Sequence, residues 1–216
     1  MKSLDIRKSV YGENHPDVAN SYNNIGNINY YQGEFQQALE NFRKSLKIRK
    51  VVYPENHPLF ATSYHNIAMI YDNQGEYDKA LEYHLKSLET KRLVFGENHS
   101  SLVTIYNNIA ATYRNQGEYN KALEYYLKSL EIGKLASGEN HQNIAVSYND
   151  IGSVYNAQGD YENALEYLIK ALEAYKAVSE SHPQIIKIQE EILEINRTKK
   201  KSEILNQRFS SNARNI

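Results

Sequence analysis

A unit of 42 residues repeats along this chain and constrains its fold more than any other feature. Four consecutive copies span residues 17–58, 59–100, 101–142 and 143–184. Self-similarity at a fixed period is the mark of a stacked repeat, so the copies are expected to share one elongated core. The anchor positions that recur in register are Tyr22, Tyr64, Tyr106 and Tyr148; Gly33, Gly75, Gly117 and Gly159; and Ala38, Ala80, Ala122 and Ala164.

Each copy predicts two helices. In residues 101–142, Tyr106, Ile109 and Tyr113 follow helical spacing up to Gly117, a residue that suits a left-handed helix C-cap. A wider apolar stripe then predicts a second helix, formed by Tyr119, Ala122, Leu123, Tyr126, Leu127 and Leu130. Charges four residues apart are expected to pair on its exposed side, as Glu40–Lys44, Glu82–Lys86, Glu124–Lys128 and Glu166–Lys170.

The segment between copies reads Gly-Glu-Asn-His-Pro at residues 12–16 and recurs with small changes. Pro16 and Pro58 are predicted in the first turn of the following helix, where a missing N–H costs nothing. The residue before a proline is disfavoured in helical conformation. A turn role is therefore predicted for the histidine series His15, His57, His99 and His141.

Both ends of the array depart from the regular unit. Residues 1–16 match the second half of a copy, so this half-unit is expected to need a cover, which a longer array or a second copy of the chain (a homo-oligomer) would provide. Residues 185–205 are predicted as a capping helix with Ile185, Ile188, Ile192 and Ile195 on one side. Residues 206–216 are predicted as a disordered tail.

The order of anchors in residues 101–142 resembles the tetratricopeptide repeat pattern. The residues that carry the resemblance are Tyr106, Ile109, Ala110, Tyr113, Gly117, Tyr119, Ala122, Tyr126 and Ser129. The longer period and the Gly-Glu-Asn-His-Pro turn are similar to the subtype found in kinesin light chains. The resemblance covers residues 1 to about 184 and implies an all-α, right-handed superhelical solenoid of antiparallel helix pairs.

The resemblance also implies a concave surface, lined by the first helix of each pair, that holds peptides. Two adjacent polar positions there read Asn23-Asn24, His65-Asn66, Asn107-Asn108 and Asn149-Asp150. A side-chain amide both donates and accepts, so it can pair with a peptide group in both directions. The candidate groove residues are Asn23, Asn24, Asn27, His65, Asn66, Met69, Asn107, Asn108, Arg114, Asn149 and Asp150. Alternatively, these asparagines order contacts between helices or solvate the groove.

The predicted groove carries little net charge. Arg114 is expected to be opposed by Asp72 and Asp150, so a strong clamp for a carboxylate is not expected. Tyr30 and Tyr31 could stack on a ligand, although covering residues 1–16 is the favoured interpretation.

Composition argues against several classes of function. A net charge of −1 with 24% charged residues gives no electrostatic case for nucleic acid or membrane as a partner. The absence of cysteine excludes disulfides and thiolate chemistry. Equivalent histidines of stacked units would lie about 8–10 Å apart, too far to share a metal ion. No phosphate loop or catalytic motif is present, so no cofactor and no enzymatic activity are predicted.

The sequence therefore predicts a non-catalytic scaffold that holds an extended segment of a protein partner. Without a signal peptide, the cytoplasm is the expected location. Two alternatives stay open: a structural spacer or oligomerisation arm, and the sensor part of a larger effector protein.

Overall fold

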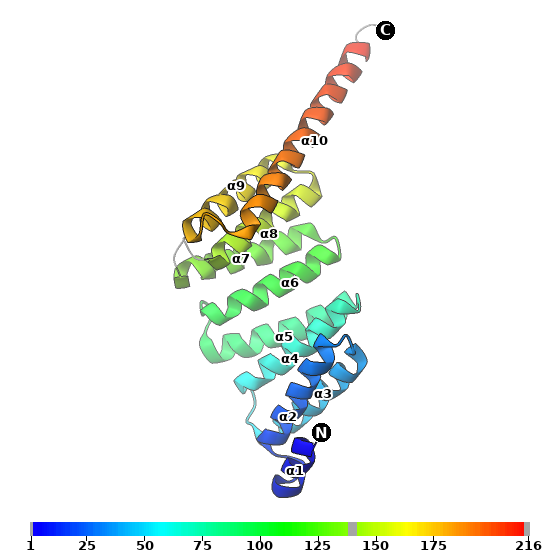
Figure 1. The fold of residues 1–216 in the computed structure, drawn as a ribbon, viewed down its shortest axis with the longest axis vertical. Coiled ribbons are helices and arrows are strands. Elements are labelled where there is room, and N and C mark those ends of the chain that lie inside the picture. Colours follow the sequence, from blue (N-terminus) through cyan, green and yellow to red (C-terminus); the bar gives the residue numbers. More distant parts are fainter. Residues whose placement is uncertain (1, 138–141, 214–216) are drawn as a thin grey trace. The chain divides into compact units, whose positions relative to one another are not determined.

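In this computed structural model, each 42-residue copy folds into two helices (Figure 1). The first helices are α2 (Pro16–Tyr31), α4 (Pro58–Asn73), α6 (Val103–Asn115) and α8 (Gln142–Gln158). The second helices are α3 (Phe35–Val52), α5 (Tyr77–Phe95), α7 (Tyr119–Ser137) and α9 (Tyr161–Val178). Helix α1 (Lys2–Tyr11) precedes them, α10 (Pro183–Ala213) follows, and a 3₁₀ turn, η1 (Ser100–Leu102), leads into α6. The structure describes residues 2–137 and 142–213, and over these residues it is all-α without strands.

The helices fall into two units, residues 1–117 and 118–216. The first unit contains α1 to α6, and the second contains α7 to α10. The division lies between the two helices of the third copy, so the borders of these units differ from the borders of the sequence repeat.

A glycine with positive φ ends each first helix of the first unit. Gly33 has φ 77° and Gly75 has φ 73°, values that an L side chain rarely adopts. The amide after each glycine donates back into the helix, from Glu34 to Asn29 at 2.8 Å and from Glu76 to Tyr71 at 2.9 Å. These Schellman bonds satisfy carbonyls that the helix end leaves unpaired. The predicted glycine C-cap is confirmed.

A histidine caps the helix that follows each inter-copy turn. The Nδ1 atoms of His15, His57 and His99 accept a hydrogen bond from the amide two residues later, at 3.2, 3.3 and 3.1 Å. Pro16 and Pro58 occupy the first position of α2 and α4, as predicted. The turn role of these histidines is thereby specified as an N-cap, which satisfies one of the free amides of a helix start.

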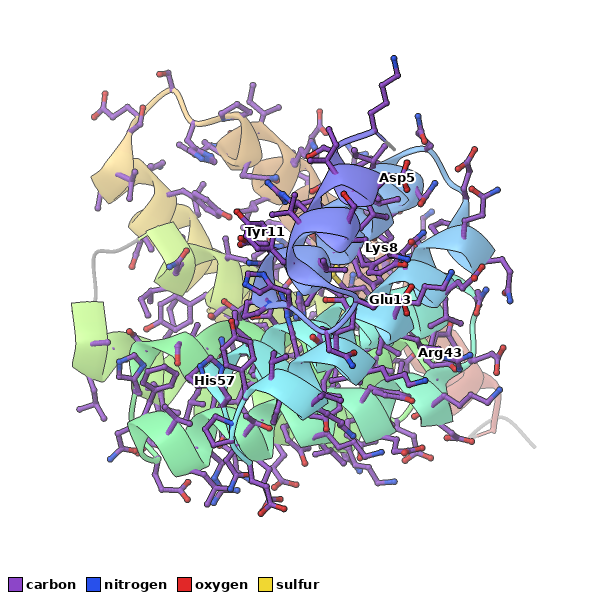
Figure 2. The ribbon with its side chains drawn as sticks, turned by 90° about the horizontal axis from the view of Figure 1, so that it is seen from below. Asp5, Lys8, Tyr11, Glu13, Arg43 and His57 are labelled. Carbon is purple, nitrogen blue, oxygen red and sulfur yellow. The ribbon has the colours of Figure 1, made fainter. Side chains whose placement is uncertain are left out.

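Each capping histidine also stacks on an aromatic ring at or beside the end of the preceding helix. The ring centroids are 4.5 Å apart for Tyr11–His15, 4.1 Å for Tyr53–His57 and 4.8 Å for Phe95–His99; Figure 2 labels Tyr11 and His57. His182 repeats the cap and the stack before α10. His141 lies outside the described residues. The imidazole therefore joins the end of one helix to the start of the next.

Small residues on the first helices allow the second helices to pack closely. A Cβ atom on Gly26 would lie 2.6 Å from the ring of Phe42, so only glycine fits without a shift. Buried serines tie the two helices of a pair together, because Ser45 and Ser87 each donate from Oγ to a carbonyl of the first helix at 2.8 Å. These bonds satisfy carbonyls that water cannot reach.

A buried guanidinium links the first helical pair to the second. Arg49 of α3 is 3% exposed. Its Nη1 donates to the Leu59 carbonyl at 3.1 Å and to Ser63 Oγ at 2.8 Å, both in α4. Its Nη2 donates to Asn20 Oδ1 of α2 at 3.3 Å. One side chain therefore fixes the position of α4 against both helices of the preceding pair.

Cations at the equivalent position make similar links elsewhere in the first unit. Arg7 of α1 donates to Ser21 Oγ of α2 at 2.6 Å, and Lys91 of α5 donates to the Ser101 carbonyl at 3.0 Å. Burial lowers the pKa of Arg49 and of Lys91. The hydrogen bonds offset part of the cost of removing these charges from water.

Helix α10 covers one side of the second unit, and it is longer than predicted. Ile185, Ile188 and Ile195 are buried in a cluster with α9, as expected of a capping helix. The helix then continues to Ala213, away from α8 and α9 (Figure 1). The tail predicted as disordered from residue 206 is therefore helical through residue 213, since no glycine or proline interrupts this stretch. Residues 214–216 lie outside the described part.

The predicted charge pairs on the second helices are confirmed. Lys44–Glu40, Lys128–Glu124 and Lys170–Glu166 are 2.6, 2.7 and 2.5 Å apart, and Lys86 pairs with Glu82. All of these side chains are substantially exposed, so each pair contributes about 0.3–0.5 kcal/mol.

We expect His57→Ala to lower the free energy of unfolding by about 1–2 kcal/mol, because the substitution removes both the N-cap of α4 and the stack on Tyr53. His57→Asn loses the ring but keeps a side-chain acceptor, so its loss should be smaller. Urea unfolding followed by circular dichroism measures both variants. Equal losses would contradict the capping role.

Candidate functional site

A cavity of about 310 Å³ lies on the first helices of the first unit, between α2 and α4. Four of the predicted groove residues line it, namely Asn27, His65, Asn66 and Met69. The remaining lining residues are Tyr30, Tyr31 and Phe42. The cavity therefore has a polar, uncharged side formed by amides and an apolar side formed by rings and the Met69 thioether.

One of the amides that line the cavity, Asn66, is hydrogen-bonded to a second predicted amide, Asn23. Asn66 Nδ2 of α4 donates to Asn23 Oδ1 of α2 at 3.0 Å. Both side chains are half-buried. The bond uses one of the two N–H groups of Asn66 and leaves its carbonyl oxygen available, while Asn23 keeps its own amide hydrogens. These asparagines therefore order the contact between helices and still carry capacity for a further hydrogen bond.

Asn66 pairs with a residue 43 positions earlier, one more than the repeat period of 42. The same offset of one residue places Asn108 of α6 beside His65 of α4. Asn108 Nδ2 lies 3.3 Å from His65 Nδ1. An amide nitrogen can only donate, so the ring nitrogen accepts and is unprotonated. His65 is half-buried, and burial, followed by the nearby charges of His84 and Lys91, lowers its pKa to about 4, against an opposing effect of Asp72.

A buried polar group that the sequence patterns do not predict lies behind His65. His84 of α5 is fully buried, with its Nε2 atom 2.8 Å from Asp72 Oδ2. Thr112 of α6 donates to the other carboxylate oxygen of Asp72 at 2.8 Å. The rings of His65 and His84 are 5.9 Å apart. Three helices, α4, α5 and α6, are joined by this group.

Alignment of the copies contains the signal that would have identified this group. His84 stands where the other copies have Phe42, Tyr126 and Leu168. Thr112 stands where they have Ile28, Ile70 and Val154. A polar residue in an apolar register requires a partner, because an unpaired buried polar group costs about 1–3 kcal/mol. Asp72 is that partner.

Asp72, expected to oppose the charge of Arg114, has its hydrogen-bond partners on other helices. Asp72 is turned towards His84 and Thr112, and it forms no ion pair with Arg114. The reason is that a buried imidazole and hydroxyl require hydrogen-bond partners, whereas the half-buried Arg114 retains access to water.

The favoured interpretation of Tyr30 and Tyr31, as a cover for residues 1–16, is wrong. Tyr30 packs against Phe35 with ring centroids 5.7 Å apart, and its hydroxyl accepts from Asn73 Nδ2 at 3.0 Å. Tyr31 is 86% exposed, and its ring lies edge-on to that of Tyr30. Both rings instead border the cavity, on the side towards the C-terminal end of α2.

The remaining predicted residues are distributed over both units. Asn24 is exposed on α2, and Asn107 is half-buried on α6, with a buried Oδ1 that has no partner among the described residues. Asn149 and Asp150 are half-buried on α8, in the second unit. The described residues contain no group of three or more His, Asp or Glu side chains that could hold a metal ion.

Comparison with known proteins agrees with this architecture of stacked helical pairs. A family model described as tetratricopeptide repeat matches residues 1–50, 59–134 and 101–177. The chain belongs to the tetratricopeptide repeat family. Repeats of this family generally mediate protein–protein interaction and are generally non-catalytic.

Solved structures with the same fold include proteins of the kinesin light chain type. A protein from Podosopora anserina with nearly identical TPR-like repeats of this type aligns with a TM-score of 0.73 and 20% identity, over 91% of this chain and 95% of that one. BtubC (BKLC) from P. vanneervenii aligns with a TM-score of 0.72 and 18% identity, over 97% and 87% of the two chains.

The apo form of RapI aligns with a TM-score of 0.74 and 23% identity, over 89% of this chain and 68% of that one. At these identities the structures show the fold alone. No curated protein matches the chain significantly. No helix in the described ranges is long and apolar enough to cross a membrane.

We expect stability to fall as the pH drops from about 6.5 towards 4, by about 3 kcal/mol from His65 alone. The unfolded histidine takes up a proton near its ordinary pKa, whereas the folded one resists protonation, so acid favours the unfolded chain. His65→Asn introduces the residue found at the equivalent positions Asn23, Asn107 and Asn149. Urea unfolding across this pH range should show a weaker pH dependence in His65→Asn; an unchanged slope would contradict the assignment.

Proposed function

We propose that this protein is a non-catalytic scaffold that holds an extended segment of a partner protein on the first helices of its first unit. The observation that supports this most is the cavity between α2 and α4, where Asn27, Asn66 and His65 meet the rings of Tyr30 and Tyr31. Membership of a family that mediates protein interaction makes a protein partner the natural occupant.

The chemistry of the cavity indicates the kind of segment that would fit. The amides of the polar wall can donate to and accept from the backbone of an extended peptide. Binding at this wall would therefore depend little on the side chains of the peptide. The apolar wall, with Phe42 and Met69, suits one large side chain of the peptide. A volume of about 310 Å³ is at the small end of ligand sites, which fits an anchor residue rather than a whole ligand.

The experiment begins with peptides selected from a random library against the wild-type protein. We expect Asn27→Ala combined with Met69→Ala to weaken the selected peptides about tenfold or more, because both cavity walls lose contacts. Asn196→Ala, on the outer side of α10, is the matched control and should leave affinity unchanged. Fluorescence anisotropy gives the affinities, and thermal melting verifies the fold.

Two results would refute the groove. One is full affinity in the double variant with an unchanged melting temperature. The other is that Asn196→Ala weakens binding as much as the cavity variants do.

Self-association is a second candidate function, favoured by the surface of α1. This helix has no buried residue, and Ile6 and Val10 are 61% and 63% exposed. The equivalent of Ile6 in α3 is Ile48, which packs with Val18 of α2 and is buried. The apolar positions that contact a first helix in the other pairs therefore face solvent in α1, and a second copy could cover them.

We expect the wild-type protein to gain mass with concentration in sedimentation experiments if α1 mediates assembly. Ile6→Glu with Val10→Glu should then give a monomer, because burying two carboxylates in an apolar contact is unfavourable. A wild-type monomer at every concentration would refute this function and leave the peptide groove unaffected.

A further inference from the structure

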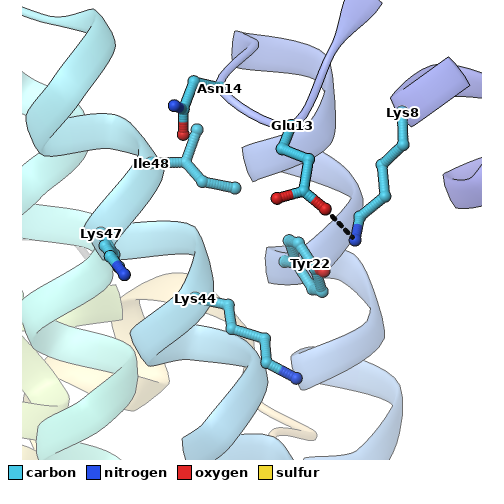
Figure 3. Close-up of a pocket in the computed structure, with 7 residues that line it drawn as sticks. All are labelled: Lys8, Glu13, Asn14, Tyr22, Lys44, Lys47 and Ile48. Carbon is cyan, nitrogen blue, oxygen red and sulfur yellow. Dashed lines mark hydrogen bonds and ion pairs between the residues drawn. The ribbon is translucent and has the colours of Figure 1, made fainter.

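A second cavity, of about 370 Å³, lies among α1, α2 and α3 (Figure 3). Its lining consists of Lys8, Glu13, Asn14, Tyr22, Lys44, Lys47 and Ile48. None of these residues lines the cavity between α2 and α4. The proposed peptide groove therefore leaves this cavity unexplained.

The residues that line this cavity carry a net positive charge. Three lysines and one glutamate line it, which leaves a formal charge of +2. Lys8 contacts Glu13 at 3.4 Å, and Lys44 pairs with Glu40 at 2.6 Å. Lys47 makes no ion pair or hydrogen bond with any described residue. Figure 3 shows the three lysine side chains arranged around Tyr22 and Glu13.

An aromatic ring holds two of these ammonium groups in place. The Nζ atoms of Lys8 and Lys44 lie 5.4 and 5.7 Å from the centroid of the Tyr22 ring. Attraction to the ring face restrains both side chains near one another, in spite of their like charge. The Tyr22 side chain also raises the pKa of Lys8. The cations are thus arranged before any ligand arrives.

Comparison with the next helical pair identifies what is special here. The equivalents of Lys8, Tyr22 and Lys44 are Lys50, Tyr64 and Lys86, so these positions are common to both pairs. Lys47, in contrast, corresponds to Glu89, and the later copies have Glu131 and Glu173. The equivalent set in α3, α4 and α5 therefore has two lysines and two glutamates, with no net charge.

We propose that the cavity among α1, α2 and α3 is a binding site for a phosphate group. A phosphate monoester carries about −1.5 to −2 charges at neutral pH, which is close to the formal charge of +2 on the residues that line the cavity. Its oxygens can accept from the three ammonium groups, the Asn14 amide and the Tyr22 hydroxyl.

Glu13 does not close this site. Its side chain is 80% exposed, and its contact with Lys8 is long, at 3.4 Å. The ammonium group of Lys8 keeps further hydrogens for an incoming oxygen, since lysine has three donors. The site does not depend on the peptide groove, so each can fail without the other.

Isothermal titration with inorganic pyrophosphate at physiological salt tests the site on the full chain. Wild type is expected to bind one equivalent. Lys47→Glu, which installs the residue of the other copies, should weaken binding about tenfold or more by replacing attraction with repulsion. Lys79→Glu makes the same change of charge outside the cavity and should bind like wild type. Glu89→Lys should create a second site and bind two equivalents.

Further ligands separate the sources of the phosphate. A phosphoserine peptide that binds tighter than pyrophosphate would indicate a phosphorylated protein, and the reverse order would indicate a free phosphate compound; both support the site. Four results overturn it: no binding to wild type, equal losses in Lys47→Glu and Lys79→Glu, a single equivalent in Glu89→Lys, or citrate binding as tightly as pyrophosphate. Circular dichroism confirms that each variant folds.

Discussion

The placement of one helical pair on the next depends on the buried guanidinium of Arg49. Its bonds to the Leu59 carbonyl, Ser63 and Asn20 join α3 to α4 and to α2, and they exist only when α4 has one position. Apolar packing alone is tolerant of small shifts, whereas a buried charge requires its hydrogen bonds and so penalises them. The cavity between α2 and α4 is lined by residues of those two helices and by Phe42 of α3. Its shape therefore follows from a contact made by none of its lining residues.

Positions 72, 84 and 112, in the second and third copies, depart together from the residues that the other copies carry there. A histidine at position 84 brings a polar ring into a layer that holds Phe42 in the preceding pair. Asp72 pairs with the Nε2 atom of that ring, whose Nδ1 atom has no partner among the described residues, and Thr112 donates to the second oxygen of Asp72. Each residue alone would leave a buried polar group unpaired, which costs more than the group contributes when paired. His65 lies between this network and the cavity, and it is the only histidine among the residues that line the cavity. The fold favours the neutral form of this histidine, because it lowers the pKa of its ring.

Local rules explain why most of the fold was predictable from the sequence. Gly75 ends a helix through its own φ, and Pro58 and His57 start one through their own ring geometry, so no knowledge of distant residues is needed. The candidate site was less predictable because its bonds cross between helices. The residue equivalent to Asn23 in the second copy is His65, but Asn23 pairs with Asn66. Neighbouring first helices are therefore offset by one residue from the repeat period. Arg114 and Asp72 share a predicted face, yet Asp72 turns to a partner in α5 that helical periodicity does not reveal.

The bond between Asn23 and Asn66 removes the conflict between two interpretations of these amides. An asparagine can order helices and bind a peptide at the same time, because an amide has more hydrogen-bonding positions than one contact uses. The bond between the two side chains fixes their rotamers, and rotamers that are already fixed lose little entropy when a ligand binds. Ordering of the helices is therefore what would make these amides effective as ligands for a peptide backbone. An amide free in solvent, such as Asn24, lacks that restraint and would have to be ordered by the ligand itself.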